Sequence, residues 1–192
     1  METEKMNKVV VDEEKRDIGV GASRKVSNSE LFIRFMALLL SLTAALVLAF
    51  DKQTEIIPVT LVSTLPPLYV PATAKFHYLS AFTYFVVANA VACAYGAVSF
   101  IVTLAKRGSN KRGLANWIIM FDLIMVALLA SGSGAAAAVG VLGYNGNEHV
   151  RWNKVCNVFG KFCNLVKVSV GFSLLGLLLF MFLVMIAVVR KH

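Results

Sequence analysis

Four long apolar segments, separated by polar ones, set the pattern of this chain. They cover residues 30–50, 79–104, 114–142 and 167–189. Each segment reaches the ~20 residues that an α-helix needs to cross the hydrocarbon core of a bilayer. The pattern therefore predicts an all-α integral membrane protein, a four-helix transmembrane bundle in which residues 27–192 form one membrane domain.

The polar segments differ in character. Residues 1–26 hold six Lys or Arg, six acids and almost no aromatic residues, which predicts a disordered tail. Ser27 and Glu30 then have the spacing of a capping box that starts the first helix. All four prolines fall within 51–78, so this connection is not helical throughout. A short strand over 56–62 is predicted there.

The distribution of charge predicts the topology. Twelve Lys and Arg fall in the tail, in the 105–113 loop and after the last span, against five in the outer loops 51–78 and 143–166. The positive-inside rule then places both termini in the cytosol. The net charge of +8 is explained by such loops and their contact with anionic membrane lipid, so no nucleic-acid partner is predicted.

Two cysteines lie in the second outer loop. Cys156 and Cys163 have six residues between them and face an oxidising compartment in this topology, which favours a disulfide. The alternative is a metal site that includes His149. It lacks a fourth ligand and a recognisable spacing, so no metal is predicted.

Small residues recur at every fourth position in three of the spans. This spacing puts each set on one helix face, where backbones can approach closely. It indicates packing within one bundle, a dimerisation face, or both. The fourth span is bulky nearly throughout, which predicts contact with lipid or a partner subunit. The small residues concerned are Ala37, Ser41, Ala45, Ala49, Ala88, Ala92, Gly96, Gly132, Ala136 and Gly140.

Two charged residues, Arg34 and Asp122, lie inside the spans. The topology puts both in the cytosolic leaflet, where an ion pair between the first and third spans would lower the cost of burying either charge. A proton or ion relay is the functional alternative, and it would favour further acids, histidines or broken helices at membrane depth. A third alternative is that Arg34 snorkels to the headgroups and leaves Asp122 protonated. Asn89, in the middle of the second span, is expected to hydrogen-bond a neighbouring helix.

Catalytic chemistry finds no support in the sequence. It contains no G-x-S-x-G, P-loop or H-E-x-x-H motif and no paired carboxylates within a span. Neither enzyme activity nor a cofactor is predicted.

Four features together resemble the Casparian strip membrane protein-like (CASP-like) family of plants, which is distantly similar to four-span MARVEL proteins. They are Arg34 in the first span, and the stretches YLSAFTYFVVANAVACAYG, FDLIMVALLASGSGAAAA and NEHVRWNKVCNVFGKFC. The resemblance implies that Arg34 and Asp122 are the family's intramembrane charges. It also implies that Cys156 and Cys163 are its outer-loop cysteines.

The resemblance also implies a function. It implies a plasma-membrane protein that forms homo- or hetero-oligomers with related four-span proteins and acts as a scaffold able to recruit wall-modifying enzymes. The first outer loop does not resemble that of the strip-forming members, so Casparian strip formation itself is not predicted. The alternative function is a small transporter or channel subunit that uses Asp122 in the membrane.

Overall fold

The computed structural model describes residues 28–59, 68–105, 112–146, 149 and 154–190. The predicted disordered tail 1–26, the capping residue Ser27 and most of the 105–113 loop lie outside the described residues. Among those described are four helices long and apolar enough to cross a membrane, so the predicted fold class is confirmed. They are α2 (Asn28–Ala49), α3 (Ser80–Ala105), α4 (Arg112–Asn145) and α5 (Gly160–Val189).

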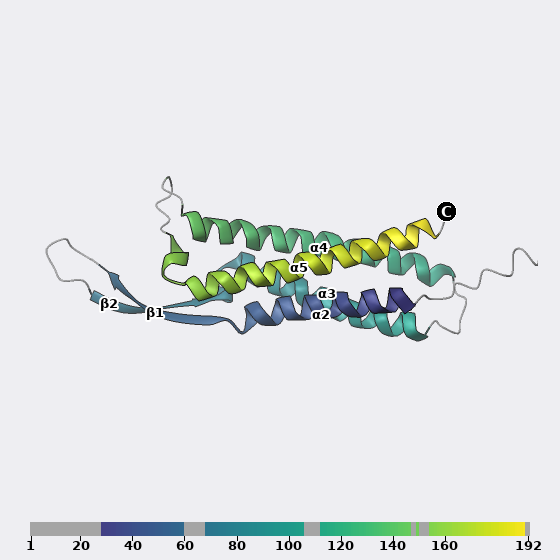
Figure 1. Ribbon diagram of the computed structural model, residues 1–192, viewed down its shortest axis with the longest axis horizontal. Helices are drawn as coiled ribbons and strands as arrows, with labels where there is room; N and C mark the ends of the chain where they lie inside the picture. Colours follow the sequence, from purple (N-terminus) through teal and green to yellow (C-terminus); the bar gives the residue numbers. More distant parts are fainter. Residues whose placement is uncertain (1–27, 60–67, 106–111, 147–148, 150–153, 191–192) are drawn as a thin grey trace, which may run out of the picture.

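The four helices form an elongated bundle in which each packs against two others (Figure 1). Helices α2 and α4 both pack on α3 and on α5, so α2 and α4 lie diagonally opposite each other. The start of α2 and the end of α5 lie at the same end of the bundle. An ion pair between Glu30 and Arg190 joins them there, as expected for an even number of spans.

Two helices extend beyond the predicted spans at the opposite end of the bundle. Helix α5 begins at Gly160, well before the predicted start at residue 167, so Cys163 lies in a helix and not in a loop. Helix α4 continues to its last residue, Asn145. Gly146 follows with a φ of 72°, which is typical of a glycine that terminates a helix. Hydropathy marks only the part of a helix in hydrocarbon, whereas backbone hydrogen bonding continues into the polar interface.

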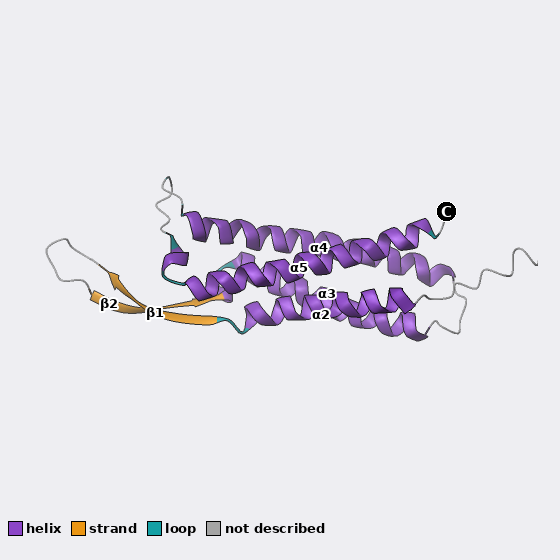
Figure 2. Cartoon of the chain, viewed as in Figure 1, coloured by secondary structure: helices purple, strands orange, loops and turns teal. Residues whose placement is uncertain are grey.

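The connection between α2 and α3 contains a β-hairpin, which projects from the bundle (Figure 2). Strands β1 (Lys52–Val59) and β2 (Leu68–Lys75) pair antiparallel, with Lys52 opposite Lys75. The predicted strand over 56–62 overlaps β1, which begins four residues earlier, while residues 60–62 lie outside the described residues. Strand β2 was not predicted. Both strands of a two-stranded sheet are edge strands, so each tolerates a residue without an N–H donor.

The core of the bundle is divided along its length. Two apolar clusters, one containing Phe85 and the other Phe180, lie on either side of a polar level. In every helix, one buried polar residue falls between the positions that contribute to the two clusters. We call this set the neutral layer; it comprises Ser41, Asn89, Ser133 and Ser173.

Candidate functional site

The structure brings the two intramembrane charges into contact across the bundle. Arg34 lies in the second turn of α2, and Asp122 lies in the first third of α4. The Arg34 guanidinium donates from Nη1 to Asp122 Oδ1 at 3.1 Å and from Nη2 to Oδ2 at 2.9 Å. Because α2 and α4 are diagonal, this bidentate pair passes through the centre of the bundle and does not join two neighbouring helices.

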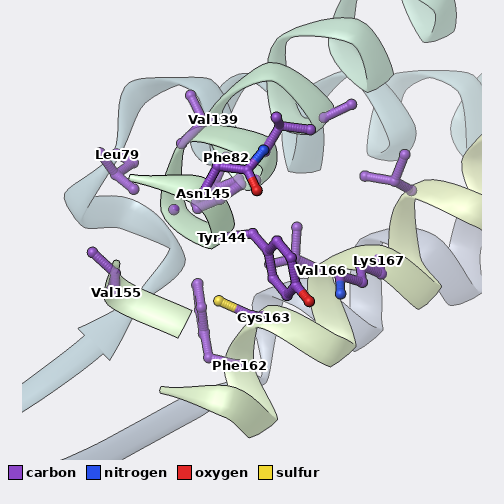
Figure 3. Close-up of a pocket in the computed structure, with 15 residues that line it drawn as sticks. Leu79, Phe82, Val139, Tyr144, Asn145, Val155, Phe162, Cys163, Val166 and Lys167 are labelled. Atoms are coloured by element: carbon purple, nitrogen blue, oxygen red, sulfur yellow. The ribbon is translucent and has the colours of Figure 1, made fainter. Parts of the chain in front are cut away.

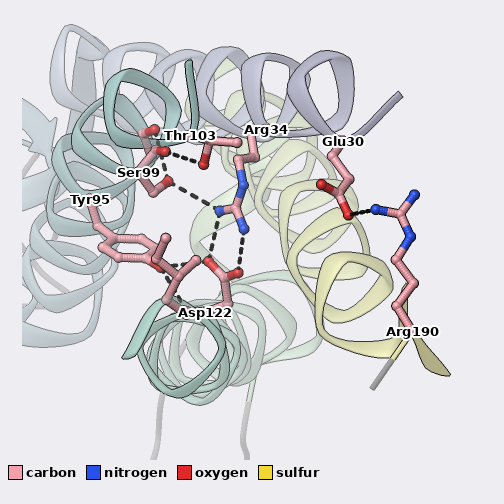
Figure 4. Close-up of polar contacts among 9 residues, drawn as sticks. Glu30, Arg34, Tyr95, Ser99, Thr103, Asp122 and Arg190 are labelled. Carbon is pink, nitrogen blue, oxygen red and sulfur yellow. Dashed lines mark hydrogen bonds and ion pairs between the residues drawn. The ribbon is translucent and has the colours of Figure 1, made fainter. Parts of the chain in front are cut away.

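Helix α3 supplies the remaining partners of the pair (Figure 4). The Tyr95 hydroxyl lies 2.6 Å from Asp122 Oδ1 and 3.0 Å from the carbonyl of Ile118. Arg34 Nη1 also donates to Ser99 Oγ at 3.3 Å. Three helices therefore meet at one level, which we call the charged layer and define as Arg34, Tyr95, Ser99 and Asp122.

The charged layer is closed to the surroundings of the bundle. Asp122 is fully buried and Arg34 is 7% exposed. Helix α5 covers the layer through Phe180, whose ring centroid lies 6.1 Å from that of Tyr95. Both carboxylate oxygens accept hydrogen bonds from donors in the bundle, so the carboxylate needs no water. Such charge-assisted bonds offset the cost of placing ions in a medium of low dielectric constant.

The predicted cysteine pair forms a disulfide. Cys156 lies in the short 3₁₀ helix η3 (Val155–Asn157), Cys163 lies in the first turn of α5, and their Cα atoms are 5.7 Å apart. A Cβ placed on Gly143 would lie 3.7 Å from Cys156 Sγ, so the disulfide also packs against the end of α4. No group of three potential metal ligands occurs in the part of the chain that the structure describes.

The predicted small residues mediate close packing inside the bundle. A Cβ on Gly96 would lie 3.4 Å from Leu38 Cβ, and one on Gly132 would lie 3.2 Å from Ala88 Cβ. The stripe on α3 therefore faces α2 at one level and α4 at another. The remaining members are buried in the core, except Ala49 at the end of α2 and the partly buried Gly140. Buried are Ala37, Ser41, Ala45, Ala92 and Ala136.

Helix α5 exposes large apolar residues such as Leu175 and Phe182, and it also carries a small-residue face that was not predicted. A Cβ on its Gly176 would lie 3.8 Å from the carbonyl oxygen of Ala37. Its Ser169 donates to the carbonyl of Ala44 at 2.5 Å, and Ser173 is buried nearby in sequence. Ser169, Ser173 and Gly176 have the spacing of one helix face, which would have predicted this packing. The large side chains between them obscured the pattern.

Other contributing residues were also missed in the sequence. Tyr95 and Ser99 continue the α3 face that carries Ala88 and Ala92, so extending that stripe would have found them. Arg190 could have been matched to Glu30, because an even number of spans returns the chain to the same side. The contact of Asn89 differs from expectation, since its Nδ2 donates to the carbonyl of Phe85 in its own helix.

An acid at the opposite end of the bundle was missed as well. Asp51 follows α2 and is 7% exposed, and its Oδ2 has no hydrogen-bond partner among the described residues. Burial raises the pKa of the Asp51 carboxyl above its usual value, while the nearby charge of Lys161 acts in the opposite direction. The hairpin is held to the same region by the Phe162 N–H, which donates to Gln53 Oε1 at 2.8 Å.

The fold and this site define a four-helix integral membrane protein whose bundle is linked across its diagonal by a buried ion pair and carries a disulfide at the end next to the hairpin. Comparison with known proteins narrows the class. The model of the Casparian strip membrane protein domain matches residues 23–179, so the chain belongs to that family.

Named relatives agree with this assignment. CASP-like protein 1E2 of Glycine max is 52% identical over 95% of this chain and 97% of its own length. CASP-like protein 1E1 of Glycine max is 56% identical over 85% and 86%. CASP-like protein 1E1 of Arabidopsis thaliana is 47% identical over 97% of both chains. No solved structure matches.

Proposed function

We propose that this protein is an oligomeric scaffold of the plasma membrane, with both termini in the cytosol, and not an enzyme. In this role it associates with copies of itself and with related four-span proteins. The resulting membrane domain recruits wall-modifying enzymes on the outer side. Membership of the Casparian strip membrane protein domain family supports this role, and the asymmetric distribution of Lys and Arg supports the orientation.

The observation that carries the proposal is the closed charged layer. A transport site needs a charge that can exchange its partner for an ion, a proton or water. Both oxygens of Asp122 instead accept bonds from Arg34, and Tyr95 adds a further contact. Because Arg34 and Asp122 are paired with each other, they favour a structural role in a rigid bundle whose surface contacts partners.

Self-association requires a surface that other helices can approach. Helix α4 offers one, because four small residues on one face are exposed in the bundle, and a Cβ on Gly134 would meet nothing within 4 Å. Small residues on a lipid-facing surface permit close helix–helix contact between subunits. We define this small face as Ala127, Ser131, Gly134 and Ala138.

Blue-native electrophoresis with crosslinking in nanodiscs tests the proposal. We expect the parent protein to migrate as oligomers, and Gly134→Leu to shift it towards monomer because the larger side chain separates the small faces. Gly171→Leu is the matched control, since an added Cβ there also meets nothing within 4 Å but the residue lies on α5. A monomeric parent protein, or equal effects of the two variants, would contradict the proposal.

Reconstitution in liposomes tests the alternative function. A scaffold should produce no ion flux, whereas a channel or transporter should produce a flux that Asp122→Asn changes while oligomers persist. Photobleaching of the tagged protein in a plant plasma membrane adds a second measurement, in which a scaffold recovers slowly. Flux that depends on Asp122 in a well-folded protein would favour the transporter over the scaffold.

A further inference from the structure

An apolar cavity opens at the end of the bundle that carries the hairpin and the disulfide (Figure 3). Its volume is about 340 Å³, which falls in the range of roughly 300–1,000 Å³ typical of small-molecule sites. Helices α3, α4 and α5 line it, and most of the lining is hydrocarbon. The main apolar side chains are Leu79, Phe82, Ala137, Val139, Val166 and Val170.

Two glycines of α4 help to form the cavity. Gly140 and Gly143 both line it, and a Cβ on Gly140 would lie 3.7 Å from Val166 Cγ1. A long side chain at position 140 would therefore occupy the space between α4 and α5. The disulfide fixes the outer wall, because Cys156 packs near Gly143 and Cys163 lines the cavity.

The rim of the cavity is polar and positively charged. Lys167 places its Nζ 4.4 Å from the centroid of the Tyr144 ring, and Asn145 lies beside them at the end of α4 (Figure 3). The lining contains this one ionisable cation and no carboxylate. An occupant with an acidic head and an apolar body would match both parts of the site.

The depth of the rim in the bilayer identifies the head of that occupant. Lys167 precedes the last residue of α5, Val189, by 22 positions, which corresponds to roughly 33 Å along a helix. The hydrocarbon core is about 30 Å thick, so the ammonium group lies at the level of lipid headgroups when Val189 lies at the other interface. Val170 and Ala137 lie deeper, at the level of acyl chains.

We propose that this cavity binds one acyl chain of a phospholipid from the leaflet next to the hairpin, with the lipid phosphate on the Lys167 ammonium. In the orientation proposed above, this is the outer leaflet. The inference goes beyond the scaffold role and does not depend on it, since a monomeric bundle would contain the same cavity.

Photolabelling in nanodiscs of neutral phosphatidylcholine tests this site. The probe is phosphatidylglycerol with a diazirine midway along one acyl chain, and the comparison probe is diacylglycerol with the same chain and no phosphate. We expect phosphatidylglycerol to label the peptides that contain residues 137–145 and 162–170 above the lipid-facing background of α2. Diacylglycerol should label them less.

Two variants separate the acyl and phosphate contacts. Gly140→Leu should lower site labelling about tenfold, because the new side chain displaces about two acyl methylenes. Gly171→Leu, on α5 and outside the cavity lining, should leave labelling unchanged. Lys167→Gln should lower labelling by phosphatidylglycerol about fivefold, the contribution of one Lys near a charged headgroup. It should not change labelling by diacylglycerol, and Lys161→Gln should change neither.

Three results would overturn the site. The first is labelling at the background level of α2 in the parent protein. The second is an equal response to Gly140→Leu and Gly171→Leu in variants that keep the disulfide and run as single species. The third is equal labelling by the two probes with no effect of Lys167→Gln, which would indicate an apolar occupant, such as a sterol, without phosphate selection. Oligomeric state is measured in the same nanodiscs, so failure here is distinguishable from failure of the scaffold role.

Discussion

Two polar layers cross the same bundle, and they are constructed differently. In the charged layer, Arg34 reaches across the diagonal to Asp122, and Tyr95 and Ser99 contact the pair from a third helix. In the neutral layer, Asn89 donates to its own helix at Phe85. Ser41 likewise donates to Leu38 in its own helix. Ser133 and Ser173 join two helices there, through a hydroxyl–hydroxyl bond of 2.9 Å.

The difference follows from what each group needs in hydrocarbon. A hydroxyl or an amide can bond a carbonyl one turn earlier in its own helix, whatever the neighbouring helices do. An ion needs a counter-ion, and Asp122, the counter-ion of Arg34, is on another helix. The charged layer should therefore determine how the helices assemble, whereas the neutral layer should contribute little to assembly.

The largest expected effect follows from Asp122→Asn. The change leaves the buried guanidinium of Arg34 without its counter-ion, and breaking a buried pair in this way costs about 3–5 kcal/mol. We expect the variant to lose most of its monodisperse fraction in size-exclusion chromatography and to unfold at a clearly lower temperature in detergent.

A double variant is the control for this prediction. Replacing both members of the pair, as Arg34→Met with Asp122→Leu, removes both charges and fills similar volume, which is often neutral or stabilising in proteins. We expect it to recover most of the lost stability. A double variant as unstable as Asp122→Asn would show that the cost does not arise from the unpaired charge.

Tyr95→Phe should have a smaller effect in the same layer. It removes the hydroxyl that contacts Asp122 Oδ1 at 2.6 Å and keeps the ring, which packs near Phe180. A hydrogen bond to a charged group contributes about 1.5–3 kcal/mol. Thermal unfolding should show an intermediate loss that largely disappears in the Arg34→Met, Asp122→Leu background. An equal loss in both backgrounds would show that the hydroxyl stabilises the bundle through its bond to the Ile118 carbonyl instead.

The sequence predicts much of the charged layer and little of the neutral one. Hydropathy and loop charges put Arg34 and Asp122 in one leaflet, and the need to neutralise buried charge pairs them. That the pair joins diagonal helices depends on the packing order around the bundle, which no single span encodes. The neutral layer gives a weaker signal, because Ser and Asn in a span can satisfy themselves locally.

The end of the bundle that carries the hairpin was predicted less well, for a physical reason. The apolar run that predicts the fourth span begins only at residue 167, because Lys161 and Lys167 interrupt it, yet helix α5 begins at Gly160. Strands β1 and β2 contain Pro58 and Pro71, and a strand accommodates proline at the edge of a sheet. Both features depend on position in the assembled structure, at the membrane interface or at the edge of a sheet.

The neutral layer gives a prediction of opposite sign. Asn89 is fully buried, and its Oδ1 has no hydrogen-bond partner among the described residues. Asn89→Leu replaces this acceptor with a side chain of similar length, and an unsatisfied buried acceptor costs about 1–3 kcal/mol. We expect the unfolding temperature to stay the same or rise, whereas Asp122→Leu alone should lower it. A large loss at position 89 would mean that the amide has a partner in the membrane, such as a bound water or another subunit.

Ser133→Ala should have the smallest effect, although it removes a bond that links two helices in the neutral layer. Ser133 donates this bond and Ser173 Oγ accepts it, so the change leaves the Ser173 hydroxyl able to donate to a carbonyl of its own helix. Hydrogen bonds between transmembrane helices contribute only about 0.6 kcal/mol on average. A double-mutant cycle with Ser173→Ala, measured by thermal unfolding, should therefore give a coupling far below that of the Arg34–Asp122 cycle. Equal couplings would mean that hydroxyl pairs hold this bundle together as strongly as the ion pair, and the distinction between the two layers would fail.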